Sequence, residues 1–234
     1  YFKLVNLFVK NDYMLNSLNI TLRDYTIVPM SPQVGLIQWI EGSDTIGHLI
    51  EEYRRSHDFD PFLERHLMEM QTITKIDSLL PIQRYESLTS IAAGTSNADL
   101  RTLMWLKSPS ADHWLVRTLH LQKSAAINSI TGYTLGLGDR HASNIMIDRK
   151  TGDMIHIDFG DCFEVSYDRV LFPEKIPFRL TRMLVAAFGI GGVDTEFRNV
   201  SERVFAVVRE NASSIASVLE LFLLEGNYTT LEKG

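Results

Sequence analysis

Cysteine is nearly missing from this sequence, since Cys162 is the only one among 234 residues. A single cysteine excludes the intramolecular disulfide framework that stabilises many small secreted proteins. The sequence therefore predicts a protein of a reducing compartment, and we expect a cytoplasmic location.

Long apolar runs and an excess of basic residues are also lacking. No run approaches the roughly 20 apolar residues that a membrane-spanning helix needs, and the stretch 218–224 is interrupted by Glu220. Lys and Arg number 23 against 29 Asp and Glu, which gives a net charge of −6. Because nucleic-acid binding requires a basic face, the sequence predicts neither a transmembrane segment nor a nucleic-acid partner.

The first sixty residues predict a helix followed by two strands and a second helix. Residues 2–11 carry apolar side chains at helical spacing. The ranges 25–28 and 35–39 are typical of short strands that flank a turn. We expect Asp44 to cap the next helix and the polar range 54–60 to be exposed.

The pattern from about residue 80 onward is mainly helical. Ser108 and Pro109 are expected to open a long helix that continues through Ile130. A later helix over residues 179–189 is expected to end at its glycine.

The segment 136–161 carries the chemistry. Two apolar runs, 145–148 and 154–157, flank a glycine-containing turn and predict a β-hairpin. Pairing like residues symmetrically about Thr151 sets Asn144 opposite Asp158. Directly opposed residues have Cα atoms about 4.5–5.5 Å apart, so the two side chains can share one hard cation. Mg²⁺ suits such a site because it takes only one or two protein oxygen ligands.

Asp139 and His141 lie on the glycine-broken loop before this hairpin. Near a metal-bound phosphate, Asp139 can accept the proton of an attacking hydroxyl. His141 can stabilise the charge that develops on a transferred phosphoryl group. The segment therefore predicts phosphoryl transfer.

Two other interpretations stay open at this point. Asn and Asp at strand ends are common turn residues, so each residue alone can be structural. A metal-dependent phosphoesterase could use Asp139, His141, His156 and Asp158, but two-metal hydrolases need more clustered ligands. His156 is also expected to point to the opposite face of its strand from its neighbours.

The motifs GLGDRHASNIMID and HIDFGDCFE resemble the catalytic and activation loops of the phosphatidylinositol-3-kinase-related protein kinases, and within them the target-of-rapamycin (TOR) branch. LMWLKSPSADHW and FPEKIPFRLTRML extend the resemblance. It implies an α+β fold, a mainly helical kinase C-lobe with a remnant of the N-lobe sheet. The implied division is 1–40 for the partial N-lobe and hinge, 41–225 for the C-lobe and 226–234 for a divergent tail.

The same resemblance implies a role for each motif residue. Asp139 and His141 would be catalytic, and Asn144 and Asp158 would hold Mg²⁺. LIQWIEGSDT resembles the interlobe hinge. Seven residues would surround the adenine of ATP: Tyr25, Ile37, Trp39, Ile40, Thr45, Met146 and Ile157.

The resemblance further implies ATP with Mg²⁺ or Mn²⁺ as cofactors, protein substrates, and regulatory scaffold proteins of a TOR-type complex. It leaves open a peripheral location on endomembranes. No glycine-rich loop or ATP-anchoring lysine precedes Tyr1, so we expect these residues by themselves to be inactive. A phosphoinositide lipid kinase and an inactive scaffold remain as alternatives.

Overall fold

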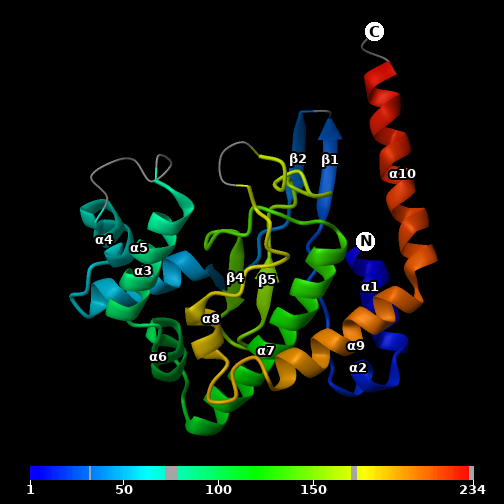
Figure 1. Ribbon diagram of the computed structural model, residues 1–234. Helices are drawn as coiled ribbons and strands as arrows, with labels where there is room; N and C mark the ends of the chain where they lie inside the picture. The colour runs from blue at the N-terminus through cyan, green and yellow to red at the C-terminus, as the bar shows by residue number, and fades with distance from the viewer. Residues whose placement is uncertain (32, 72–78, 170–172, 232–234) are drawn as a thin grey trace.

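A computed structural model describes residues 1–31, 33–71, 79–169 and 173–231, with side chains through residue 221. The described residues form a mainly helical α+β structure with two small antiparallel sheets (Figure 1), which confirms the predicted fold class. The helices are α1 Phe2–Asn11, α2 Tyr13–Ser17, α3 Ile46–Ser56, α4 Leu63–Gln71, α5 Pro81–Gly94, α6 Asp99–Leu106, α7 Ala111–Thr134, α8 Arg182–Ala187, α9 Glu196–Glu210 and α10 Ala212–Leu231. The strands are β1 Ile27–Ser31, β2 Val34–Ile37, β3 Ser43–Thr45, β4 Ile145–Asp148 and β5 Met154–His156.

Among the described residues, strands β1 and β2 pair only with each other, and they project from the body of the molecule (Figure 1). They correspond to the predicted strands 25–28 and 35–39 but are shifted along the chain. Every described residue of this hairpin is exposed, including Val28, Leu36 and Ile37. The hairpin therefore presents apolar side chains on both faces.

Helix α7 lies at the centre of the fold, where it packs against α9 and against the edge strand β5. An edge strand has outward-facing backbone groups that need partners, and α7 supplies them with two buried side chains one turn apart. The Met154 N–H donates to Ser124 Oγ at 2.7 Å, and Asn128 Nδ2 donates to the Met154 carbonyl at 3.0 Å. These bonds fix the hairpin β4–β5 on the helix.

The register of this hairpin differs by one residue from the prediction. The observed pairs are Ile145–His156, Met146–Ile155 and Ile147–Met154. The cause is a four-residue turn in which the Asp148 N–H donates to the Asp153 carbonyl and the Gly152 N–H donates to the Asp148 carbonyl. Gly152 has φ +84, and a Cβ there would lie 2.7 Å from the Arg117 carbonyl oxygen.

Two predicted helix caps are also wrong by one or two residues. Asp44 lies in β3 with its carboxylate paired to Arg149, and Thr45 caps α3 by accepting the His48 N–H. At the start of α7 the cap is Ser110. Ser108 instead donates its hydroxyl hydrogen to the Met104 carbonyl at the end of α6.

The hydrophobic core lies between α7, α9, α1, α3 and α6, and its fully buried side chains include Val5, Leu100, Leu121, Val200 and Val204. Helix α8 is shorter than expected and is followed by Gly189 at φ +88. Helix α10 leads away from this core toward the C-terminus (Figure 1). Among the helices in the described part of the chain, none is long and apolar enough to cross a membrane.

The range 54–60 was expected to be exposed, and Arg54 contradicts this because only 4% of it is exposed. Its guanidinium donates to Asp99 at 2.7 Å and to both carboxylate oxygens of Glu64 at 2.7 Å. The hydrogen bonds that Arg54 donates to Glu64 and Asp99 raise its pKa, the bonds to Glu64 being the stronger cause and burial opposing both. Arg54 therefore joins α3, α4 and α6.

Replacing Arg54 by Met is expected to lower the free energy of unfolding by about 3–5 kcal/mol, because Asp99 is then left buried without its counter-charge. The neighbouring Arg55 forms a surface pair with Glu51 and its side chain is 64% exposed. Arg55→Met should therefore cost only about 0–1 kcal/mol. Urea denaturation of both variants measures the difference, and equal losses would contradict the buried ion-pair interpretation.

Candidate active site

The loop between α7 and β4 holds the predicted catalytic residues and lies close against the segment 158–169. A Cβ on Gly138 would lie 2.1 Å from Ser166 Oγ, so only glycine allows this approach. Asp139 has φ +56 and Asp158 has φ +58. Non-glycine residues rarely adopt such a backbone, which costs about 1–3 kcal/mol and tends to occur at functional sites.

Asp139 is held by partners on two sides. Its N–H donates to Glu174 Oε2 at 2.7 Å, and its carbonyl accepts from Asn144 Nδ2 at 2.9 Å. Its carboxylate is half-buried, with Oδ2 3.9 Å from His141 Nε2 and Oδ1 4.0 Å from an Arg169 nitrogen. The carboxylate is thus fixed in place, and it is still accessible to an incoming hydroxyl.

His141 is an exposed residue whose ring is oriented by the backbone. The Ser143 N–H donates to His141 Nδ1 at 3.2 Å, so in the neutral ring the hydrogen lies on Nε2. That nitrogen is the one nearest to Asp139. His141 therefore presents a donor next to the predicted base, as stabilisation of a developing anion requires.

Asn144 and Asp158 are the predicted metal ligands. Because the register is shifted, Asn144 lies opposite Ile157, whose N–H donates to the Asn144 carbonyl at 3.1 Å, and Asp158 is one residue further on. The Asn144 amide nitrogen is engaged by the Asp139 carbonyl, which leaves the amide oxygen as the free ligand atom. Together with a carboxylate from Asp158, this donor set fits Mg²⁺.

Arg140 is a functional residue that the sequence reasoning missed. It is buried, and its guanidinium donates to the carbonyls of Gly138 and Ile157 at 2.7 Å each, and to the carbonyl of Asp158. Burial lowers the pKa of Arg140, opposed by the nearby charges of Asp139 and Asp158. One side chain therefore joins the catalytic loop to the end of the hairpin.

The seven residues predicted to surround adenine are not gathered in one described cavity. Thr45 and Met146 are paired across β3 and β4, and Ile157 follows β5. Ile37 is the last residue of the projecting hairpin and is 68% exposed. Trp39 follows the hairpin and is 81% exposed, and Ile40 next to it is half-buried.

Tyr25 lies beside the end of the hairpin β4–β5, close to Asp158 and stacked on Phe159 with ring centroids 6.4 Å apart. Burial is the main cause that raises the pKa of its phenol. Phe2 of α1 packs edge-on against the same Phe159 ring at 4.9 Å. A mainly apolar cavity of about 700 Å³ lies here, between α1, Tyr25 and the segment 159–165.

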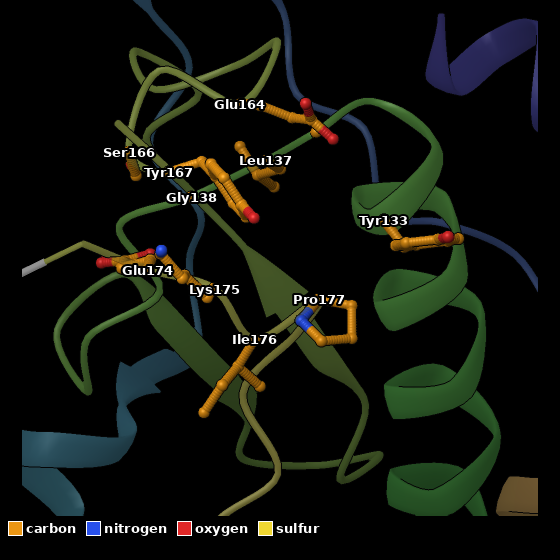
Figure 2. A pocket seen from close by; sticks show the side chains of 11 residues that line it. Tyr133, Leu137, Gly138, Glu164, Ser166, Tyr167, Glu174, Lys175, Ile176 and Pro177 are labelled. Carbon is orange, nitrogen blue, oxygen red and sulfur yellow. The ribbon is translucent and has the colours of Figure 1, made fainter. Parts of the chain in front are cut away.

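A second cavity, of about 240 Å³, adjoins Gly138. Figure 2 shows Tyr133 projecting from α7 on one side, Glu174 and Lys175 on the opposite side, and Pro177 between them. Leu137 and Glu164 complete the part of the wall nearest the catalytic loop. This cavity adjoins the catalytic loop at Gly138, the residue before Asp139, and its other walls come from residues 164–167 and 174–177.

The hydrolase alternative finds no support among the described residues. They contain no group of three or more His, Cys, Asp or Glu side chains arranged to hold a metal ion. His156 is buried, and burial is the main cause that lowers its pKa to about 3. His156 is thus a core residue that belongs to no such group, and it offers no ligand to a two-metal site.

The sequence matches the family model described as phosphatidylinositol 3- and 4-kinase over residues 2–230. It is 42% identical over 224 residues to serine/threonine-protein kinase TOR2 of Saccharomyces cerevisiae, covering 96% of this chain and 9% of the relative. Identity to tor1 of Schizosaccharomyces pombe is 43% over 224 residues, covering 96% and 10%. A solved structure described as the Tel1 kinase butterfly symmetric dimer matches with a TM-score of 0.79 and 34% identity, covering 93% of this chain and 9% of that one. The chain thus spans about a tenth of the length of these relatives.

Replacing Arg140 by Lys is expected to loosen both loops that it joins, because an ammonium group cannot reproduce the planar fork of a guanidinium. Hydrogen bonds to charged groups contribute about 1.5–3 kcal/mol each, so amide exchange at residues 138–144 and 157–160 should accelerate at least about tenfold. Arg149→Lys is the control, since Arg149 is exposed and pairs only with Asp44 in the described structure. Unchanged exchange in the Arg140 variant would show that the loops hold without it.

Proposed function

The chain belongs to the phosphatidylinositol 3- and 4-kinase family, and from this membership and the geometry around Asp139 we propose that it is the catalytic part of an ATP-dependent serine/threonine protein kinase. The family resemblance drawn from the sequence motifs is confirmed. The single observation that carries the proposal is the arrangement of Asp139, His141 and Asn144 on one loop against Asp158.

Asp139 is proposed as the group that accepts the proton of the substrate hydroxyl. Its backbone is bonded on both sides, and the Asn144 amide that binds its carbonyl also donates to its Oδ2 at 3.4 Å, so the carboxylate is held in place. The His141 Nε2–H, 3.9 Å away, would stabilise negative charge on the transferred group. Asp139 would therefore accept the proton, and His141 would stabilise the developing negative charge.

We propose Asn144 and Asp158 as the residues that hold Mg²⁺, or Mn²⁺ in its place. A bound divalent ion supplies charge neutralisation for the phosphates of ATP. The residues of this chain contribute orientation: Asp139 positions the Asn144 amide, and Arg140 positions the Asp158 backbone. The seven predicted adenine residues remain a proposal.

A protein acceptor is favoured over a phosphoinositide by the charges beside the site. A multiply anionic lipid head group needs free basic side chains. In the described residues of the segment 158–178, Arg169 is paired with Asp161 and faces Asp139, and Lys175 lies over the Tyr167 ring at 5.2 Å. Neither cation is therefore free to bind a lipid phosphate. A neutral serine or threonine hydroxyl needs no basic partner.

The cavity beside Gly138 gives such an acceptor a place to bind. Its wall combines apolar groups with two carboxylates, Glu164 and Glu174, and it borders the loop that carries Asp139. We propose that a segment of the protein substrate crosses this cavity. We further propose regulatory scaffold proteins of a TOR-type complex as partners, and a cytoplasmic or endomembrane-peripheral location.

Asp139→Asn and Asp158→Asn separate the two proposed roles, and Asn is chosen because it tolerates the left-handed backbone at both positions. In the full-length protein that contains this chain, Asp139→Asn should lower kcat at least about 100-fold, the contribution of a general base. Its affinity for Mg·ATP should stay within about twofold of the parent value.

Asp158→Asn should instead weaken Mg·ATP binding together with turnover, because a metal ligand loses its charge. Isothermal titration and radiolabelled ATP turnover measure both quantities. A large loss of nucleotide affinity in Asp139→Asn, with residual chemistry, would move Asp139 into the ligand-holding role.

The substrate class is tested by assaying the full-length protein in parallel on serine/threonine peptide libraries and on phosphatidylinositol vesicles. Phosphorylated peptide without phosphorylated lipid is expected, because both basic side chains of the described segment are engaged. Robust lipid turnover without peptide signal would refute the protein-kinase assignment and leave the phosphotransfer site intact.

A further inference from the structure

The backbone of Asp139 is in a conformation that its own loop does not explain. Its φ of +56 is unfavourable for a residue with a Cβ. Within the loop, only the Asn144 side chain bonds to the Asp139 backbone, and it bonds to the carbonyl. The N–H of Asp139 is instead satisfied from 35 residues away.

That partner is the Glu174 carboxylate, whose Oε2 accepts the Asp139 N–H at 2.7 Å. A hydrogen bond to an ionised acceptor is about twice as strong as a neutral one. Because the acceptor lies on a different segment, it restrains the peptide unit that sets the direction of the Asp139 side chain.

Glu174 is itself anchored to the segment that precedes it. Its N–H donates to the carbonyl of Ser166 at 3.0 Å, and the buried Ser166 hydroxyl donates to Asp161 Oδ2 at 2.9 Å. The Asp161 carbonyl accepts the Gly138 N–H at 2.8 Å. The contacts form a closed circuit that returns to the residue before Asp139.

We infer that Glu174 is a positioning residue that holds the catalytic Asp139 through its backbone N–H, so that turnover depends on the contacts that join Asp161, Ser166 and Glu174 to the catalytic loop. The inference rests on the proposed role of Asp139. Arg169 belongs to the same arrangement, since it is paired with Asp161 and lies 4.0 Å from Asp139 Oδ1.

A competing role for Glu174 is direct contact with the substrate, because its side chain also lines the cavity beside Gly138 (Figure 2). The two roles predict different kinetics. Loss of a positioning contact lowers kcat, whereas loss of a substrate contact raises the KM for peptide.

The test compares Glu174→Ala and Glu174→Gln in the full-length protein that contains this chain, at saturating Mg·ATP and with peptide varied. A misplacement of about 1 Å can cost about 100-fold in rate, so Glu174→Ala is expected to lower kcat by about 10- to 100-fold with the KM for peptide within about threefold. Glu174→Gln keeps an oxygen that can accept the Asp139 N–H. It should therefore retain kcat within about fivefold of the parent value.

The matched control is Asp168→Asn, which removes a carboxylate from the same segment. Asp168 is exposed, and its side chain makes no hydrogen bond or ion pair with the described residues. Its kcat should equal that of the parent. Asp139→Asn, measured alongside, separates the two proposals: if it retains turnover, the proposed function fails, whatever Glu174 does.

Three results overturn the positioning role while Asp139→Asn is inactive. The first is a Glu174→Ala enzyme with kcat within about twofold of the parent. The second is a rise in peptide KM at unchanged kcat, which makes Glu174 a substrate contact. The third is a Glu174→Gln enzyme as slow as Glu174→Ala, which makes the charge, and not the accepted hydrogen bond, the cause.

Discussion

The active-site region depends on one buried guanidinium. Arg140 makes its hydrogen bonds to main-chain carbonyls, those of Gly138, Asn144, Ile157 and Asp158. A buried cation is costly unless its donors are all engaged, and the planar fork of arginine can serve several carbonyls at once. The catalytic loop and the end of the hairpin are consequently held at a fixed separation, because neither can move without leaving a buried charge unsatisfied.

Arg140 binds the end of the hairpin β4–β5, and α7 holds the other side of the same hairpin. Ser124 and Asn128 complete the backbone bonds of Met154 on the edge strand, so small polar residues in the middle of a buried helix have a structural role. The turn of the hairpin fits under Arg117 only because residue 152 is glycine. The predicted metal ligands therefore lie on a segment that is restrained at its turn, along its edge and at its end.

The sequence was informative where function depends on residues close together in the chain. The location of Asp139, His141 and Asn144 on one loop and the existence of the following hairpin were predicted correctly, because a tight loop and a short turn bring such residues together locally. The register was wrong by one residue, since pairing like side chains ignores the turn. In the turn, Asp148 accepts the N–H groups of Lys150 and Thr151.

Long-range partners left no signal in the sequence. Arg54 stands in a polar run that is typical of an exposed loop, yet its buried partner Asp99 is 45 residues away. Arg140 and Glu174 were missed for a related reason: they bind backbone carbonyl and N–H groups, which every residue possesses. Residue types reveal such contacts at helix caps and turns, where the partner is a few residues away, but not where the main-chain partner is distant in the sequence.

Long-range contacts also explain why two aspartates of this site tolerate a left-handed backbone. Arg140 accounts for Asp158 by binding its carbonyl, and Glu174 accounts for Asp139 by binding its N–H. Both restraints come from outside the strained residue's own turn, as expected where surrounding structure must impose an unfavourable conformation. The direction of each carboxylate is therefore set by packing among three segments, and the chemistry of the motif is complete only when those segments are assembled.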